Sequence, residues 1–258
     1  MTADCIPLRF AGPERSARLR ELTGRDEYAV LGTNTANAIE LLSALLENES
    51  AGETKLKATD LVAADRDRLL AAVYKRAYGD RIESTLTCAQ CGEPFDLFFS
   101  LERLIETVNK PTPQEEWRAL GDGRFETSDG LSFRLPTGTD ELALTGLSAP
   151  EMEALLLDRC LEGEGIGRRR LLEELLEKVA PLLDLELIAK CAECGHVHTI
   201  HFDIQTYVLG ALLAERRRLL AEINRIARSY SWSLDEILSL RRSDRRRFVE
   251  LIENEYVT

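Results

Sequence analysis

Two Cys-x-x-Cys-Gly segments, at residues 88–92 and 191–195, constrain this chain more than any other feature of its sequence. Two such pairs supply the four thiolates of one tetrahedral zinc site. The glycine that follows each second cysteine suits the tight turn of a metal-binding knuckle. The sequence therefore predicts one shared zinc ion, and its ligands would be Cys88, Cys91, Cys191 and Cys194.

The residues around the two pairs match as well. An extended segment precedes each pair, at 81–86 and 185–189. After each pair, side chains alternate at the same offset, as in strands: Phe95, Leu97, Phe99 and Leu101 in the first copy, and His198, Ile200, Phe202 and Ile204 in the second. The unit is therefore predicted to be strand, knuckle and strand, written twice.

Four thiolates leave no open coordination position, so the predicted zinc is structural and not catalytic. It would hold the ends of an insertion, residues 102–184, together. Two alternatives stay open at this point: cysteine turns without a metal, and two separate sites completed by other ligands. A third, a catalytic metal with an open position, fits the four thiolates least well.

Three histidines, His196, His198 and His201, crowd the second knuckle and are the only ones in the chain. Any of them could replace a cysteine as a ligand. His198 has the same offset as Phe95, which favours a strand position, and a complete thiolate set needs no further ligand. The sequence leaves open whether a histidine touches the metal.

Cysteine usage also bears on the compartment. The six cysteines form two close pairs and two singles, Cys5 and Cys160, which is typical of a reducing environment. Cys160 is predicted to be a buried residue of a helix. The first residues lack the features of a secretory signal, and no apolar run approaches the ~20 residues that cross a bilayer. We expect a cytoplasmic protein that does not enter a membrane.

Charge is unevenly distributed along the chain. The net charge is −12, but residues 205–258 carry ten arginines and eight acidic residues, so this tail is +2. An acidic body repels phosphate backbones, which argues against a general nucleic-acid binder. The arginine clusters of the tail keep one alternative open, a zinc-ribbon adaptor that binds nucleic acid.

The predicted fold is α+β and mainly helical, with a two-knuckle zinc ribbon as its core, an inserted α/β segment and a C-terminal helical hairpin. We predict three regions: an irregular N-terminal arm with two helices (1–78), the ribbon with its insertion (79–204), and a long helix followed by a helical hairpin (205–258). The predicted helices are 34–47, 65–78, 149–161, 168–180, 205–230, 234–240 and 244–253, with a hairpin at 124–136 and a short helix from Thr139.

Nothing in the sequence argues for an enzyme. It contains no phosphate-binding glycine loop, no Gly-x-Ser-x-Gly and no His-Glu-x-x-His. The glycine-rich segment at 163–167 follows no apolar strand and is predicted to be a loop. We therefore expect a protein that acts by binding.

The order of these parts resembles the T-even phage baseplate hub assembly chaperone family, which occurs in contractile phage tails and phage-tail-like injection systems. The matching pieces start near residue 60 and lie at 65–92, 133–140, 191–204, and 226–238 with 245–248; the last piece, which contains Ile226-Ala227-Arg228-Ser229-Tyr230-Ser231-Trp232, is the most specific. The first sixty residues carry little of the resemblance and are expected to hold contacts particular to this system.

The resemblance implies a non-enzymatic role in building a baseplate. The protein would help hub or wedge proteins assemble, or it would stay in the particle as a minor component. Large aromatic and arginine side chains often anchor interfaces, so the candidate partner contacts in the C-terminal hairpin are Arg228, Tyr230, Trp232, Arg245 and Phe248. Packing within the hairpin is the alternative for the aromatic residues.

Overall fold

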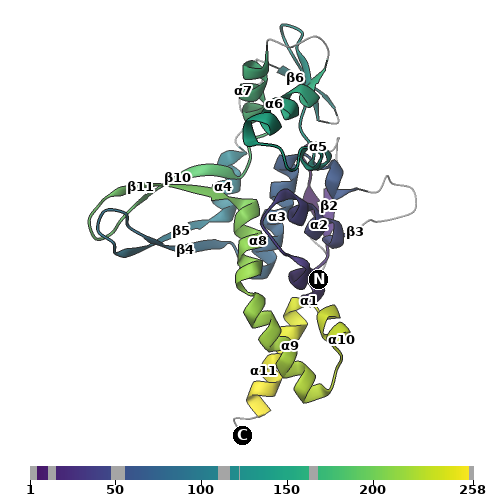
Figure 1. Ribbon diagram of the computed structural model, residues 1–258, viewed down its shortest axis with the longest axis vertical. Helices are drawn as coiled ribbons and strands as arrows, with labels where there is room; N and C mark the ends of the chain where they lie inside the picture. The colour runs from purple at the N-terminus through teal and green to yellow at the C-terminus, as the bar shows by residue number, and fades with distance from the viewer. Residues whose placement is uncertain are drawn as a thin grey trace. The chain divides into compact units, whose positions relative to one another are not determined.

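The computed structural model describes residues 5–10, 16–47, 56–109, 117–121, 123–162 and 168–255 (Figure 1). The chain forms two compact units. Unit 1 contains Met1–Cys5, Ala17–Ala58 and Gln205–Thr258, and unit 2 contains Ile6–Ser16 and Thr59–Ile204. The division at 204/205 coincides with the predicted start of the C-terminal region. Residues 17–58, however, group with that region and not with residues 59–78.

Unit 1 is largely helical. Its elements are β2 (Ser16–Leu19), α1 (Gly24–Ala29), α2 (Thr35–Leu45), β3 (Leu46–Glu47), α8 (Ile204–Ala214), α9 (Arg216–Tyr230), α10 (Leu234–Ser239) and α11 (Arg242–Glu255). Strands β2 and β3 pair in antiparallel fashion, with Leu19 opposite Leu46. The N-terminal arm before residue 34, predicted to be irregular, thus contains short strands and the helix α1. Thr23 and Asp26 form a capping box that starts this helix.

The long helix predicted over 205–230 is interrupted. Helix α8 ends at Ala214 and α9 begins at Arg216, and the backbone of Glu215 between them lies at φ −80° and ψ −4°. The apolar repeat runs through this point without a change, so the sequence pattern does not indicate the break. The two predicted helices that follow are present as α10 and α11.

The C-terminal helices of unit 1 enclose their own hydrophobic core. Its buried residues are Leu219, Ile223, Ile226, Ile237, Leu238 and Ile252. The αL backbone of Ser231, at φ 55°, ends α9 and turns the chain towards α10. The Ser233 side chain then accepts a hydrogen bond from the Glu236 N–H and caps α10.

Unit 2 contains the remaining elements. They are α3 (Ala63–Tyr78), β4 (Arg81–Thr87), β5 (Pro94–Ser100), α4 (Leu101–Val108), β6 (Trp117–Gly121), β7 (Arg124–Thr127), β8 (Ser132–Arg134), α5 (Gly138–Ala143), α6 (Ala149–Cys160), β9 (Leu161–Glu162), α7 (Arg169–Val179), β10 (Asp184–Lys190) and β11 (Val197–Asp203). Two short segments, β1 (Cys5–Pro7) and the 3-10 helix η1 (Ala58–Asp60), straddle the unit boundaries in sequence. The mixture of helix and sheet agrees with the predicted α+β class.

The segment between the two knuckles has a sheet of its own, and it shares its core with Phe10, Val62 and Ala64, which precede the first knuckle. Strands β6, β7, β8 and β9 form a four-stranded antiparallel sheet in that order, which extends the predicted 124–136 hairpin on both sides. The sheet packs with α6 and α7 around buried apolar side chains that include Phe125, Phe133, Leu157, Leu172 and Leu175.

The two knuckle hairpins repeat each other residue for residue. The first pairs Arg81 with Ser100 and Thr87 with Pro94, and the second pairs Asp184 with Asp203 and Lys190 with Val197. The hairpins lie side by side (Figure 1). Two ring contacts join them, Phe95 with His198 at 4.9 Å and Phe99 with Phe202 at 5.2 Å between centroids.

Both ring contacts join a position to its own counterpart in the other copy. Contacts of this kind arise where an approximate two-fold axis relates two similar surfaces. The hairpins are therefore arranged like the two halves of a symmetric dimer, although both belong to one chain.

Candidate metal centre

Each knuckle is built by the same backbone hydrogen bonds. In the first, Gly92 N–H donates to the Cys88 carbonyl at 2.9 Å, and in the second Gly195 N–H donates to the Cys191 carbonyl at 3.0 Å. Gly92 and Gly195 have φ values of 76° and 74°, a backbone region that favours glycine. The glycine after each second cysteine is thus required by the turn, as the sequence predicts.

The four thiols converge at the tips of the two hairpins. All four Sγ atoms lie within 4.8 Å of one another. Cys88 Sγ is 3.6 Å from Cys194 Sγ, and Cys91 Sγ is 3.9 Å from Cys191 Sγ. A tetrahedral zinc ion with Zn–S bonds of about 2.3 Å would place its sulfur ligands roughly 3.8 Å apart. The thiols therefore fit one closed four-sulfur metal site.

The Cys88 and Cys91 thiols differ in how readily they ionise. Burial opposes ionisation of Cys88, but the backbone N–H groups of Cys91 and Gln90 lower the pKa of its thiol to about 5. The Glu93 backbone favours the Cys91 thiolate, yet the neighbouring Cys88 and Cys194 sulfur atoms raise the pKa of Cys91 to about 12. Four thiolates at this spacing repel one another, so all four ionise together only around a bound cation.

The histidines are placed differently from one another. His198 Nε2 lies 3.3 Å from Cys88 Sγ, and its ring stacks on Phe95. His196 is exposed and meets the His198 ring edge-on at 4.8 Å. His201 Nε2 lies 3.3 Å from an Asp184 carboxylate oxygen. Within the described residues, the only metal-ligating cluster found contains the four cysteines and no histidine.

The two remaining cysteines have no place in the cluster. Cys5 is exposed. Cys160 is fully buried at the end of α6, as predicted, and burial raises the pKa of its thiol to about 12. Cys160 therefore lacks the lowered thiol pKa that marks a reactive cysteine.

The C-terminal residues predicted to contact partners divide into two groups. Tyr230, Trp232 and Phe248 are partly buried and pack on one another, with ring centroids 5.1–5.7 Å apart. Arg228 is exposed. Arg245 is only 1% exposed and is paired within the chain, so its side chain is not accessible to a partner.

Arg245 belongs to a buried charge network that sequence reasoning missed. Its Nε donates to Glu222 at 2.8 Å and its Nη2 to both carboxylate oxygens of Glu27 at 2.9 Å. Arg242 Nη1 lies 3.2 Å from Glu27, and the same guanidinium pairs with Glu215. Glu27 is distant in sequence, so no local pattern indicates that these charges meet.

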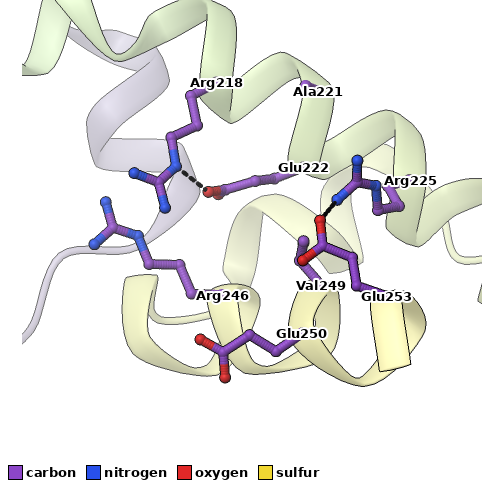
Figure 2. Close-up of a pocket in the computed structure, with 8 residues that line it drawn as sticks. All are labelled: Arg218, Ala221, Glu222, Arg225, Arg246, Val249, Glu250 and Glu253. Carbon is purple, nitrogen blue, oxygen red and sulfur yellow. Dashed lines mark hydrogen bonds and ion pairs between the residues drawn. The ribbon is translucent and has the colours of Figure 1, made fainter. Parts of the chain in front are cut away.

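A shallow cavity lies between α9 and α11 beside this network (Figure 2). Its walls carry Arg218, Ala221, Glu222, Arg225, Arg246, Val249, Glu250 and Glu253, and its volume is about 310 Å³. Arg218 pairs with Glu222 at 3.2 Å, and Arg225 pairs with Glu253. Both signs of charge line the cavity and are largely matched, so it presents no surplus of either sign to a ligand.

Residues 11–163 match the family model described as T4 bacteriophage base plate protein. The chain belongs to this phage baseplate protein family. The matched region contains the first knuckle, but the second knuckle and the C-terminal helices lie outside it. The match also begins at residue 11, so the expectation that the first sixty residues carry little of the resemblance is wrong. No curated protein and no solved structure matches the chain.

The described part of the chain contains no helix that is long and apolar enough to cross a bilayer. The metal centre has four protein donors and therefore suits a structural ion.

Proposed function

We propose that this chain is a non-enzymatic baseplate protein whose two hairpins are held together by a structural zinc ion, and which acts by binding other baseplate proteins. The observation that carries the proposal is the convergence of four thiols in a chain of the baseplate family. A set of four sulfur donors is typical of zinc in a closed structural site.

The zinc would act on the architecture of unit 2. Cys88 and Cys91 come before the insertion and Cys191 and Cys194 after it, so one ion would close a loop of about 100 residues. Closing a long loop removes conformational entropy from the unfolded chain, and binding energy of the ion adds to folding. The hairpins would then present a fixed surface to hub or wedge proteins of a contractile tail-like particle.

The finer role that we propose is assembly in the cytoplasm, as a baseplate hub assembly chaperone. The family resemblance of the knuckles and of the 226–248 segment supports it. Mass spectrometry of purified particles and of assembly intermediates tests it. A chaperone is present in the intermediates and absent from finished particles, whereas constant copies in finished particles would identify a structural component.

Cys191→Ser tests the zinc centre. The variant removes one ligand from a site whose occupancy is coupled to folding, so metal content should fall and the melting temperature of unit 2 should drop. Cys5→Ser is the matched control, because Cys5 is exposed and outside the cluster. Elemental analysis and calorimetry measure both quantities, and unchanged zinc stoichiometry in Cys191→Ser would overturn the shared site.

Two experiments separate the proposed baseplate role from the nucleic-acid alternative. Loss of baseplate assembly in a strain that carries Cys191→Ser supports the baseplate role. DNA or RNA binding by the wild-type protein that weakens steeply with salt would favour the adaptor instead. The net charge of −12 argues against the nucleic-acid alternative, because an acidic protein repels phosphate backbones.

A further inference from the structure

An apolar groove with an acidic rim crosses unit 2 away from the cysteine cluster. It is lined by Val62, Ala63, Ala64, Val108, Leu135, Pro136, Leu157, Glu173, Leu176, Glu177, Ala180, Pro181, Leu182, Asp184 and Leu185, with a volume of about 690 Å³. Twelve of these fifteen residues are apolar and three are acidic, and none is basic. The groove therefore favours a ligand that has apolar groups for its lining and positive charge for its acidic residues.

The floor of the groove is part of the unit 2 core. Val62, Leu135 and Leu157 are each less than 10% exposed. Towards the rim the apolar side chains become accessible: Leu176 is half-buried, and Leu182 is 39% exposed. A partner that covers this rim would remove leucine surface from water, which favours association.

The acidic residues of the rim are available to a partner. Glu173 and Glu177 lie one turn apart on α7 and are exposed. No ion pair of either carboxylate is found within the described residues. Asp184, the third acidic residue, is 3.3 Å from His201. Two like charges four residues apart repel each other, and a cation placed between them relieves that repulsion.

We propose that this groove binds an apolar segment of another baseplate protein, a segment with leucine-like side chains flanked by lysine or arginine. The buried floor accepts the apolar side chains, and the carboxylates of Glu173 and Glu177 pair with the basic flanks. This inference rests on the proposed function in one respect only, which is that the partner is taken to be a baseplate protein.

A synthetic amphipathic peptide of leucine and lysine is the probe for the full-length zinc-loaded protein. Methyl NMR should show shifts confined to the groove leucines, and raised salt should weaken the binding. The same peptide with glutamate in place of lysine should not bind. Shifts spread over leucines outside the groove, or equal binding of both peptides, would overturn the proposal.

Matched variants keep the test specific. Glu173→Lys with Glu177→Lys should weaken peptide binding about tenfold or more, because like charges then face the lysines. Glu102→Lys with Glu106→Lys changes the net charge equally on another exposed helix, α4, and should have little effect. Leu182→Ser should weaken binding, whereas Leu155→Ser, which alters a leucine of similar exposure outside the groove, should not.

One outcome would assign the groove to a different occupant and so contradict the proposal. Self-association that Glu173→Lys with Glu177→Lys abolishes would identify a second copy of this chain. Zinc content and particle association are measured separately, so a failure here would leave the proposed function untouched.

Discussion

A single side chain makes the metal centre asymmetric. The two hairpins place Phe95 and His198 at equivalent positions, stacked against each other. Only the histidine carries a polar ring nitrogen, and that nitrogen lies 3.3 Å from Cys88 Sγ. Cys191, the counterpart of Cys88, has a phenylalanine at the corresponding place. One of the two buried sulfur atoms therefore has a potential N–H donor that the other lacks.

We predict that His198→Phe makes zinc leave the site faster. An N–H donor to a metal-bound thiolate disperses its charge and orients it, and loss of such partners typically costs 10–100-fold in metal affinity. Zinc release to a coloured chelator measures the effect, and the absorption spectrum after cobalt substitution should keep its four-sulfur character. His196→Phe is the control, since only the backbone of His196, and not its side chain, is found in contact with a cysteine among the described residues. If the cobalt spectrum of the wild type indicates three sulfur ligands and one nitrogen ligand, and the nitrogen ligand is lost in His198→Phe, then His198 is itself a ligand. That result would contradict the prediction.

A second residue-scale prediction concerns Asp67 in α3. Its carboxylate is buried and accepts the Leu183 N–H at 3.0 Å, just before β10. Burial raises the pKa of Asp67 to about 7, against the opposing effect of that hydrogen bond, with Arg66 lowering it and Asp203 and Glu141 raising it. The folded protein thus holds a proton that the unfolded chain releases near pH 4.

The contribution of Asp67 to stability should be fully present below about pH 4 and should be lost as the pH rises towards 7, by an amount on the order of a few kcal/mol. Asp67→Asn should remove this part of the pH dependence. Urea unfolding of both proteins at saturating zinc between pH 5 and 8 measures the difference, with Asp60→Asn, an exposed position, as control. Parallel curves for the wild type and Asp67→Asn would contradict the prediction.

At the scale of elements, local patterns and long-range contacts differ in what a sequence can predict. The knuckle hairpins follow from spacing that lies within a few residues, and the α2 and α3 helices follow from their apolar faces. Strands β6 and β9 were not predicted, because β9 is two residues long and pairs with a strand far away in the chain. The sequence makes Arg245 a candidate partner contact because arginines often anchor interfaces, but its side chain is buried. Its burial depends on Glu27, which no local pattern connects with it.

We predict that Arg245→Met destabilises unit 1 by up to about 3–5 kcal/mol, because it removes the buried cation that Glu27 and Glu222 share and leaves Glu27 with Arg242 and Glu222 with Arg218. The network joins α11 to α1 and α9, so all three helices should lose stability. Chemical denaturation monitored by Trp232 fluorescence measures it. Arg247→Met, at an exposed position of the same helix, should cost little. Adding Glu27→Gln and Glu222→Gln to Arg245→Met should recover part of the loss, and no recovery would contradict an electrostatic origin.

At the scale of the whole molecule, each unit has its own means of stabilisation. Unit 1 has the core of α9, α10 and α11 and the buried charge network. Unit 2 has the core of the inserted sheet and the four-cysteine cluster. All four thiols lie in unit 2, so a bound ion directly stabilises the fold of unit 2 and not that of unit 1.

Removal of the metal should therefore affect the two units unequally. We expect a strong chelator under reducing conditions to abolish amide protection in β4, β5, β10 and β11, because four thiols without a cation no longer hold the hairpins together. Protection in α9 and α11 should persist, since their core contains no ligand of the ion. Hydrogen exchange with mass spectrometry measures both regions in the same sample, and zinc added back should restore the hairpins, which excludes irreversible damage. Equal loss of protection in both units would show that the ion stabilises the entire chain, and unchanged protection in the hairpins would show that the thiols need no metal to stay together.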